Sequence, residues 1–192
     1  MKKITIALIM VISLIAPIQT MAESVTQNGT IIEPLEQNIE QIIDEITSEP
    51  RPINSDAIQN VKEYISKYFG NLGYDNIEYQ KFEYNDENNE NAIRHSSQAD
   101  VFLASTAENA IVDGIGENII VTKNSSIDTT KNLIISAHYD SAEDSVGAND
   151  NGSGVAAVLE LARILKDTEI PYNIKFILFS GEEKYMLGSR WY

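Results

Sequence analysis

Two short apolar runs, separated by a helical pattern, constrain the fold of this chain more than any other feature. Residues 133–137 and 174–179 are rich in β-branched or aromatic side chains, as expected of buried strands. Between them, residues 155–165 place valine, leucine and alanine side chains at helical spacing. The order strand, loop, helix, strand predicts a right-handed crossover that joins two parallel strands. We therefore predict an α/β fold, in which the strand at 133–137 is buried on both faces.

The sequence before this unit predicts two helices and several more strands. Residues 34–47 place apolar side chains on one helical face, and Ser55 is expected to cap a second helix that ends near Gly70 and Gly73. Alternating or apolar runs predict strands at 77–84, 100–105 and 118–122. Residues 85–91 form an acidic, asparagine-rich run, which we interpret as a solvated loop.

The first 22 residues have the pattern of a secretory signal peptide. Lys2 and Lys3 precede an apolar run at 4–16, and the small-x-small cleavage site ends at Ala22. A membrane anchor is the alternative, but the run is shorter than the ~20 residues that a spanning helix needs. We therefore predict a secreted, extracellular protein. Its predicted segments are a signal peptide at 1–22, a flexible leader or propeptide at 23–50, and a folded domain at 51–192.

Charge and cysteine content limit the partners and ligands of the chain. It has 29 acidic and 14 basic residues and a net charge of −15, and removal of residues 1–22 takes away two lysines and no acids. Such a surface repels nucleic acid and anionic lipid, so we expect neither as a partner, and no membrane association after signal cleavage. Because the chain has no cysteine, a zinc site would use His, Asp and Glu side chains rather than thiolates.

Three short segments carry the residue types of a metal centre. His138 and Asp140 come at the end of the first apolar strand, and Asp150 lies in a glycine-rich loop before the helix. Glu182 and Glu183 follow the second apolar strand. In open α/β sheets, ligands bind in the crevice at the carboxyl ends of the strands, so these segments should converge there. Imidazole and carboxylate groups together suit zinc or a similar divalent ion.

The spacing of these residues suggests which of them bind metal, which orient a ligand and which contact the attacking water. Asp140 lies two residues after His138, so on an extended backbone it points the same way and can fix the histidine ring. The glycines around Asp150 allow a close approach to metal, where a carboxylate can bridge two ions. Glu182 and Glu183 are adjacent and should face different ways on an extended backbone. One of them can then bind metal while the other reaches the water.

These motifs resemble those of the co-catalytic di-zinc aminopeptidases, a family that also includes related carboxypeptidases and glutaminyl cyclases. The segments that carry the resemblance are 132–141, 147–154, 176–183 and 185–190. It is specific over residues 118–192 and looser over 53–117. It implies a three-layer α/β/α zinc-exopeptidase domain (phosphorylase/hydrolase-like) with a mixed, largely parallel sheet.

The resemblance also implies a role for each candidate residue. His138 and Glu183 would be terminal ligands of two different zinc ions, and Asp150 would bridge both ions. Asp140 would orient His138. Glu182 would be the general base that takes a proton from the attacking water. The implied activity is hydrolysis of the peptide bond next to the N-terminus of a peptide substrate.

The family pattern continues beyond the segments found here, with a further Asp or Glu ligand and then a His. We therefore expect a C-terminally truncated form, in which each zinc ion lacks one protein ligand and one sheet edge lies open. His95, the only other histidine, lies in a polar stretch and is expected to be an exposed loop residue. The alternatives are a non-catalytic fragment and a related carboxypeptidase or glutaminyl cyclase. A calcium-binding acidic module fits less well, because residues 140–154 lack the EF-hand spacing.

Overall fold

The computed structural model describes residues 25–27, 30–32, 34–84 and 114–192. The predicted signal peptide, the strand expected at 100–105, His95 and the acidic run at 85–91 lie outside the described residues. The chain divides into two compact units, Met1–Pro34 and Leu35–Tyr192. The first unit contains strands β1 (Val25–Gln27) and β2 (Thr30–Ile32), which pair antiparallel.

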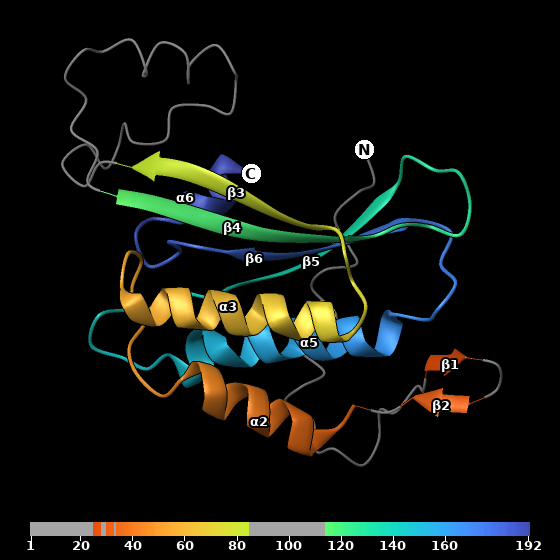
Figure 1. Cartoon of the computed structure of the whole chain (residues 1–192), viewed down its shortest axis with the longest axis horizontal. Helices are drawn as coiled ribbons and strands as arrows, with labels where there is room; N and C mark the ends of the chain where they lie inside the picture. The colour runs from red at the N-terminus through yellow and green to blue at the C-terminus, as the bar shows by residue number, and fades with distance from the viewer. Residues whose placement is uncertain (1–24, 28–29, 33, 85–113) are drawn as a thin grey trace, which may run out of the picture. The chain divides into compact units, whose positions relative to one another are not determined.

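The second unit contains the sheet and the helices that carry the candidate site (Figure 1). Its elements in chain order are α2 (Glu36–Ile46), α3 (Asp56–Asn71), β3 (Ile77–Tyr84), β4 (Gly114–Lys123), β5 (Asn132–His138), the turn η1 (Ala148–Gly152), α5 (Ser153–Leu165), β6 (Asn173–Phe179) and α6 (Leu187–Trp191). Both helices predicted before the sheet are confirmed, and Ser55 caps α3 by accepting a hydrogen bond from the backbone N–H of Ile58 at 3.1 Å. None of the described helices is both long enough and apolar enough to span a lipid bilayer.

The sheet of the second unit has the strand order β3-β4-β6-β5 and is mixed, as predicted. Strands β5 and β6 form the expected parallel pair, with Ile135 opposite Phe176 and His138 opposite Phe179. The other two pairings, β3 with β4 and β4 with β6, are antiparallel. Among the described strands the sheet is therefore not largely parallel. Periodic patterns in the sequence predict that β4 is a strand, but they do not predict its direction. That direction depends on the connections before and after β4 in the chain.

Strand β5 differs from the prediction that both of its faces are buried. In the described part of the chain it pairs only with β6, and Ile134 on its outer face is 49% exposed. The opposite face packs on α5 through the partly buried Leu133 and Ile135. The more deeply buried strand is its neighbour β6, in which Ile174, Phe176, Ile177 and Leu178 are all inaccessible to solvent. A run of apolar residues does not by itself separate a central strand from an edge strand.

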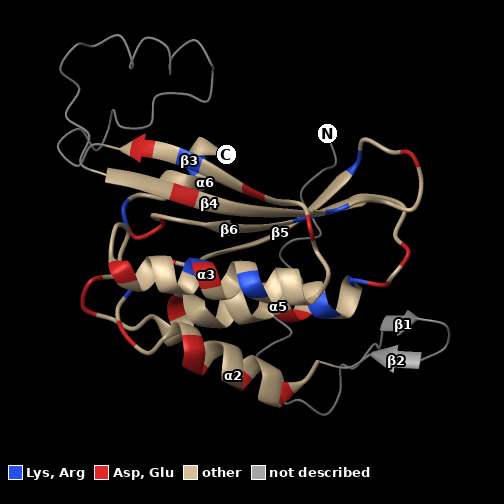
Figure 2. Cartoon of the chain, viewed as in Figure 1, with Lys and Arg blue, Asp and Glu red and all other residues tan. Residues whose placement is uncertain are grey.

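Helices α3 and α5 cover one face of the sheet, and α2 packs against α5 (Figure 1). The core on this face includes an aromatic group in which the Phe69 ring lies 5.6 Å from that of Tyr74 and 5.9 Å from that of Phe176. A smaller core on the other face packs Leu187 and Trp191 of α6 against Phe82. The sheet thus has helices on both sides, which is the three-layer α/β/α arrangement predicted. Acidic residues recur along α2 (Figure 2), whose apolar positions Ile42 and Ile46 are buried.

Helix α2 belongs to the compact second unit although it precedes residue 51, where we placed the start of the folded domain. Its N-terminus is held by the carboxylate of Glu160 on α5, which accepts hydrogen bonds from Leu35 N at 2.8 Å and Asn38 Nδ2 at 2.6 Å. These bonds and the burial of its apolar face explain why residues 36–46 form a packed helix and not a flexible leader. The suggestion that residues 23–50 include a propeptide stays a prediction.

Candidate metal centre

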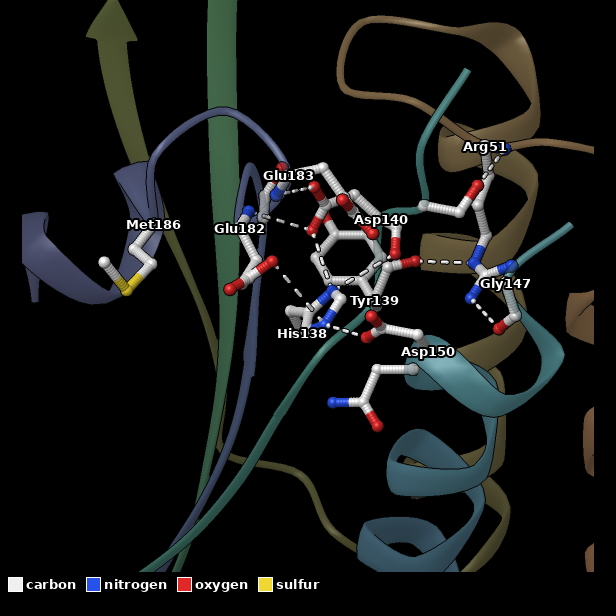
Figure 3. Close-up of polar contacts among 12 residues, drawn as sticks. Arg51, His138, Tyr139, Asp140, Gly147, Asp150, Glu182, Glu183 and Met186 are labelled. Atoms are coloured by element: carbon white, nitrogen blue, oxygen red, sulfur yellow. Dashed lines mark hydrogen bonds and ion pairs between the residues drawn. The ribbon is translucent and has the colours of Figure 1, made fainter. Parts of the chain in front are cut away.

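The candidate site lies where β5 and β6 end side by side. The parallel register sets His138, the last residue of β5, opposite Phe179, the last residue of β6. The chain then turns sharply after Phe179, so that Glu182 and Glu183 face His138 (Figure 3). The turn η1, which leads into α5, brings Asp150 to the other side of the same ring. The three sequence segments therefore converge as predicted from the strand ends.

The imidazole of His138 is the centre of the cluster. Its Nε2 lies 3.0 Å from Asp150 Oδ1 and 3.8 Å from Glu182 Oε2. The ring is only 9% exposed, whereas Asp150 is 76% exposed and Glu182 is 41% exposed. The histidine thus sits at the base of the site, and the carboxylates reach it from the solvent side.

Asp140 contacts the cluster from the buried side. Its carboxylate is 1% exposed and approaches His138 Nδ1 to 3.5 Å through Oδ1. It also accepts a hydrogen bond from the backbone N–H of Glu182 to Oδ1 and another from that of Glu183 to Oδ2, both at 3.1 Å. One buried side chain therefore fixes the end of β5 relative to the turn after β6. The orienting role of Asp140 stays a prediction, and its bonds to the glutamate backbone were not foreseen.

His138, Glu182 and Glu183 offer ligand atoms that all lie within 4.8 Å of one another. We expected the two glutamates to face different ways, on the assumption of an extended backbone, and this expectation is wrong. Gly181 has a φ of 74°, and Met186 N donates to Glu182 O at 2.8 Å, so the backbone is a turn. The turn directs both carboxylates toward His138. Alternation of side chains along a strand therefore does not decide which glutamate binds metal and which accepts the proton of the water.

The electrostatics of the site favour a bound cation. Burial lowers the pKa of His138, but the hydrogen bond and charge of Asp140, followed by Glu182 and Asp150, outweigh it and raise the pKa above 6.5. Partial burial raises the pKa of Glu183 above 4.5, and the negative charge of Asp150 raises it further. Several carboxylates around one imidazole repel one another, and a divalent ion would relieve that repulsion.

Glycine is required at residue 147, where the loop turns toward Asp150. Gly147 has a φ of 57°, a backbone conformation that other residues rarely adopt. A side chain there would also overlap the backbone carbonyl of Asp150 and the side chain of Ser141. The peptide bond between Asp150 and Asn151 is cis. Gly147 thus allows the sharp turn of the backbone before η1, and the close approach of this loop to a metal stays a prediction.

Sequence reasoning missed one residue next to the site, Arg51. It is fully buried, and its guanidinium bonds to backbone carbonyls of the loop that joins β5 to the turn η1 (Figure 3). Burial lowers the pKa of Arg51, and the negative charges of Asp140 and Glu183 act in the opposite direction. In the sequence this arginine is a single basic residue between Pro50 and Pro52. Nothing in that pattern distinguishes a buried arginine from an exposed one.

Comparisons with known proteins agree with this geometry. Residues 118–192 match Peptidase family M28. Aminopeptidase YwaD of Bacillus subtilis (strain 168) is 43% identical to this chain over 84 residues, which is 43% of this chain and 18% of that protein. The structure of a zinc aminopeptidase from Bacillus subtilis superimposes with a TM-score of 0.65 and 18% identity, over 83% of this chain and 65% of that one. For a glutaminyl cyclase from Bacteroides thetaiotaomicron, the TM-score is 0.57, with 18% identity, over 80% of this chain and 49% of that one.

The two kinds of similarity support different conclusions. At 18% identity, the solved structures show only that this chain shares its fold with a zinc aminopeptidase and a glutaminyl cyclase. The family match covers residues 118–192, from within β4 to the end of α6, and this segment includes every candidate ligand. The chain spans less than a fifth of the length of the curated aminopeptidase that it matches.

Proposed function

We propose that this chain is a zinc-dependent exopeptidase that removes N-terminal residues from peptides, because residues 118–192 match Peptidase family M28. The observation that carries the proposal is the convergence of His138, Asp150, Glu182 and Glu183 at the ends of two parallel strands. Buried Asp140 ties these strand ends together, so the cluster is held by the fold. The M28 match and the similarity to a bacterial aminopeptidase support the choice of substrate.

The residues present fit zinc. One imidazole nitrogen and three carboxylates are available, and zinc in proteins accepts both kinds of ligand. The imidazole Nε2 faces Asp150 and Glu182, while the Nδ1 side of the ring lies against Asp140, as is usual for a metal-binding histidine. We assign His138, Asp150 and Glu183 as the residues that hold zinc. The family resemblance implies two ions in the complete site, with Asp150 between them.

Bound zinc would supply Lewis acidity to a substrate carbonyl and to the attacking water. Glu182 is left to move the proton: its Oε2 lies 3.8 Å from His138 Nε2 and its side chain is open to solvent, so a water can reach both groups. The Glu182 carboxylate would accept the proton of the attacking water and then give it to the leaving amine. Asp140 would hold the backbone of Glu182 and Glu183 in place throughout.

The protein is also proposed to act outside the cell. The support is the charged start, apolar run and small-residue cleavage site at residues 1–22. Exported peptides with a free N-terminus would then be its substrates. Cleavage after Ala22 is tested by N-terminal sequencing of the protein recovered from the culture medium, and retention of residues 1–22 on an exported chain would contradict it.

The enzymatic proposal is tested by hydrolysis of aminoacyl nitroanilides with the full chain and added zinc. Glu182→Gln removes the base while keeping the size of the side chain, so turnover should fall by about 10²- to 10⁴-fold with zinc binding retained. A matched control is Glu169→Gln, which changes a carboxylate in the segment between α5 and β6. Zinc binding without turnover by the unchanged chain would favour the non-catalytic alternative. Turnover that is equal in the Glu182→Gln variant would contradict the assigned base.

A further inference from the structure

Arg51 is a buried cation next to the candidate site that the proposed mechanism does not use. Its exposure is 0%, and it is the only lysine or arginine that is buried among the described residues. Arginine is almost never buried to this extent unless its charge and donors are satisfied. The identity of its partners therefore indicates why the fold retains it.

The partners of Arg51 are backbone carbonyls of a single loop. Its Nε donates to Tyr139 O at 2.7 Å, and its two terminal nitrogens donate to Val146 O and to Gly147 O, the latter at 3.2 Å. The main chain adds a second connection, because Arg51 N donates to Ser141 Oγ at 2.9 Å and Ser141 N donates to Arg51 O at 3.3 Å.

These contacts fix both ends of the loop at 139–147. Tyr139 directly follows His138, and Gly147 lies three residues before Asp150. The guanidinium thus sets the separation between the residue after one candidate ligand and the turn that carries another (Figure 3). Asp150 Oδ1 and His138 Nε2 lie 3.0 Å apart across this loop. A loop closed in this way does not need to order itself when a metal binds, and the free energy of ordering is then not subtracted from the binding free energy.

We propose that Arg51 is a positioning residue for the metal centre, which holds the loop at 139–147 so that His138 and Asp150 present their ligand atoms to one ion. This inference rests on the proposed function, because it takes zinc as the ligand. The guanidinium is suited to the task because its planar, forked donors reach three carbonyls from one side chain. A lysine keeps the charge at this position but offers one nitrogen in place of the fork.

The test is zinc affinity of the full chain, measured at about 10 °C by competition with a chromophoric chelator. The variants are Arg51→Lys and Arg51→Met, and circular dichroism verifies that each is folded. The effect of residues that support metal ligands is about 10- to 100-fold in affinity. Arg51→Met is expected near the upper end of this range and Arg51→Lys near the lower end. The d–d absorption of bound Co²⁺ should also change in both variants, because it reports the arrangement of the ligands.

Arg163→Met is the matched control for lost stability. Arg163 also bonds within the fold, to Glu160 Oε1 at 2.7 Å and to Oε2 at 2.9 Å. It lies ten residues into α5, about 15 Å along the axis from the end next to Asp150. This variant should lose stability and keep the zinc affinity of the unchanged chain. If Arg51→Met does not fold, the zinc affinities of Arg51→Lys and of the milder Ser141→Ala variant test the inference. Ser141→Ala removes the hydrogen bond that Ser141 Oγ accepts from Arg51 N.

The outcomes separate this inference from the proposed function. Failure of the unchanged chain to bind zinc would overturn the proposed function, and the inference with it. If the unchanged chain binds zinc and the folded Arg51 variants bind it equally well, only the inference is overturned. The inference also fails if the Arg51 and Arg163 variants lose affinity alike, because the arginine would then serve stability alone.

Discussion

The carboxylate of Glu160 on helix α5 and the carboxylates at the ends of β5 and β6 differ in what neutralises them. Within the helix, Glu160 is 2% exposed and accepts hydrogen bonds from Arg163, Leu35 N and Asn38. Burial raises the pKa of Glu160, but these bonds outweigh it and lower the pKa below 4.5. The fold itself satisfies this carboxylate, and its function is to hold α2 against α5.

The carboxylates at the ends of β5 and β6 and in the turn η1 lack this balance. Asp150 and Glu182 share one imidazole, that of His138, and Glu183 has a raised pKa through partial burial and the charge of Asp150. Asp140 below them is fully buried and holds the glutamate backbone. The comparison teaches that a carboxylate satisfied by the fold stabilises structure, whereas carboxylates gathered around one histidine favour a cation from outside.

The largest effect that sharpens this contrast is expected from His138→Ala. Removing the imidazole deletes a metal ligand rather than a supporting group, so zinc affinity should fall by more than the roughly 100-fold that supporting residues reach. Titration calorimetry with zinc measures the effect, and Glu160→Gln is the control that should bind zinc normally. Equal zinc affinity of the His138→Ala variant and the unchanged chain would contradict this contrast. The carboxylates around His138 would then bind zinc no better than other acidic side chains of the protein.

A smaller loss is expected from Asp140→Asn. The amide keeps the shape of the side chain, but it has one oxygen to accept the backbone bonds of Glu182 and Glu183 and loses the charge beside His138. Zinc affinity should fall by about 10- to 100-fold in the same titration. A fall in thermal stability with unchanged zinc affinity would show that Asp140 belongs with Glu160 as a structural carboxylate.

Acidification should weaken zinc binding by up to about tenfold for each pH unit and each proton displaced. The pKa of His138 is raised above 6.5, so the imidazole ring already gains a proton as the pH falls through the neutral range. Zinc must displace this proton in order to bind the ring. The raised pKa of Glu183 acts in the same direction at lower pH. Chelator competition between pH 8 and pH 6 measures this dependence. An affinity that is constant over this range would argue against a histidine ligand with a raised pKa.

The smallest effect is expected at the satisfied carboxylate. Glu160→Gln should lower the free energy of unfolding by about 1 kcal/mol at pH 7, because the amide retains part of the hydrogen bonding. The folded pKa of Glu160 is depressed, so its contribution is present above pH 4.5 and is lost as the pH falls through the folded value. Urea unfolding of both chains at pH 7 and pH 3 should show a difference that shrinks in acid. A difference that grows in acid would contradict this assignment.

Much of the fold and site was predictable because local patterns determine it. The helical spacing before residue 47, the cap at Ser55 and the apolar runs at β5 and β6 specify elements without reference to the rest of the chain. The convergence of His138 with Glu182 follows from parallel pairing, because the carboxyl ends of parallel strands meet. Local pattern plus one topological rule was therefore sufficient to bring the candidate ligands together.

The features that escaped prediction depend on distant contacts. The exposure of Ile134 depends on whether another element packs on its face of β5, and the burial of Arg51 depends on carbonyls about 90 residues away in the chain. The direction of both glutamates depends on the turn at Gly181, where the sequence alone suggested extended backbone. No periodic pattern of residues in a single sequence indicates any of these contacts.

The most direct measurement is a crystal structure of the full chain with zinc, with anomalous difference maps recorded on both sides of the zinc absorption edge. We predict a zinc peak at the ends of β5 and β6, about 2.0–2.2 Å from the nitrogen of His138 and from carboxylate oxygens of Asp150 or Glu183. A zinc peak elsewhere on the acidic surface, with none at His138, would contradict it.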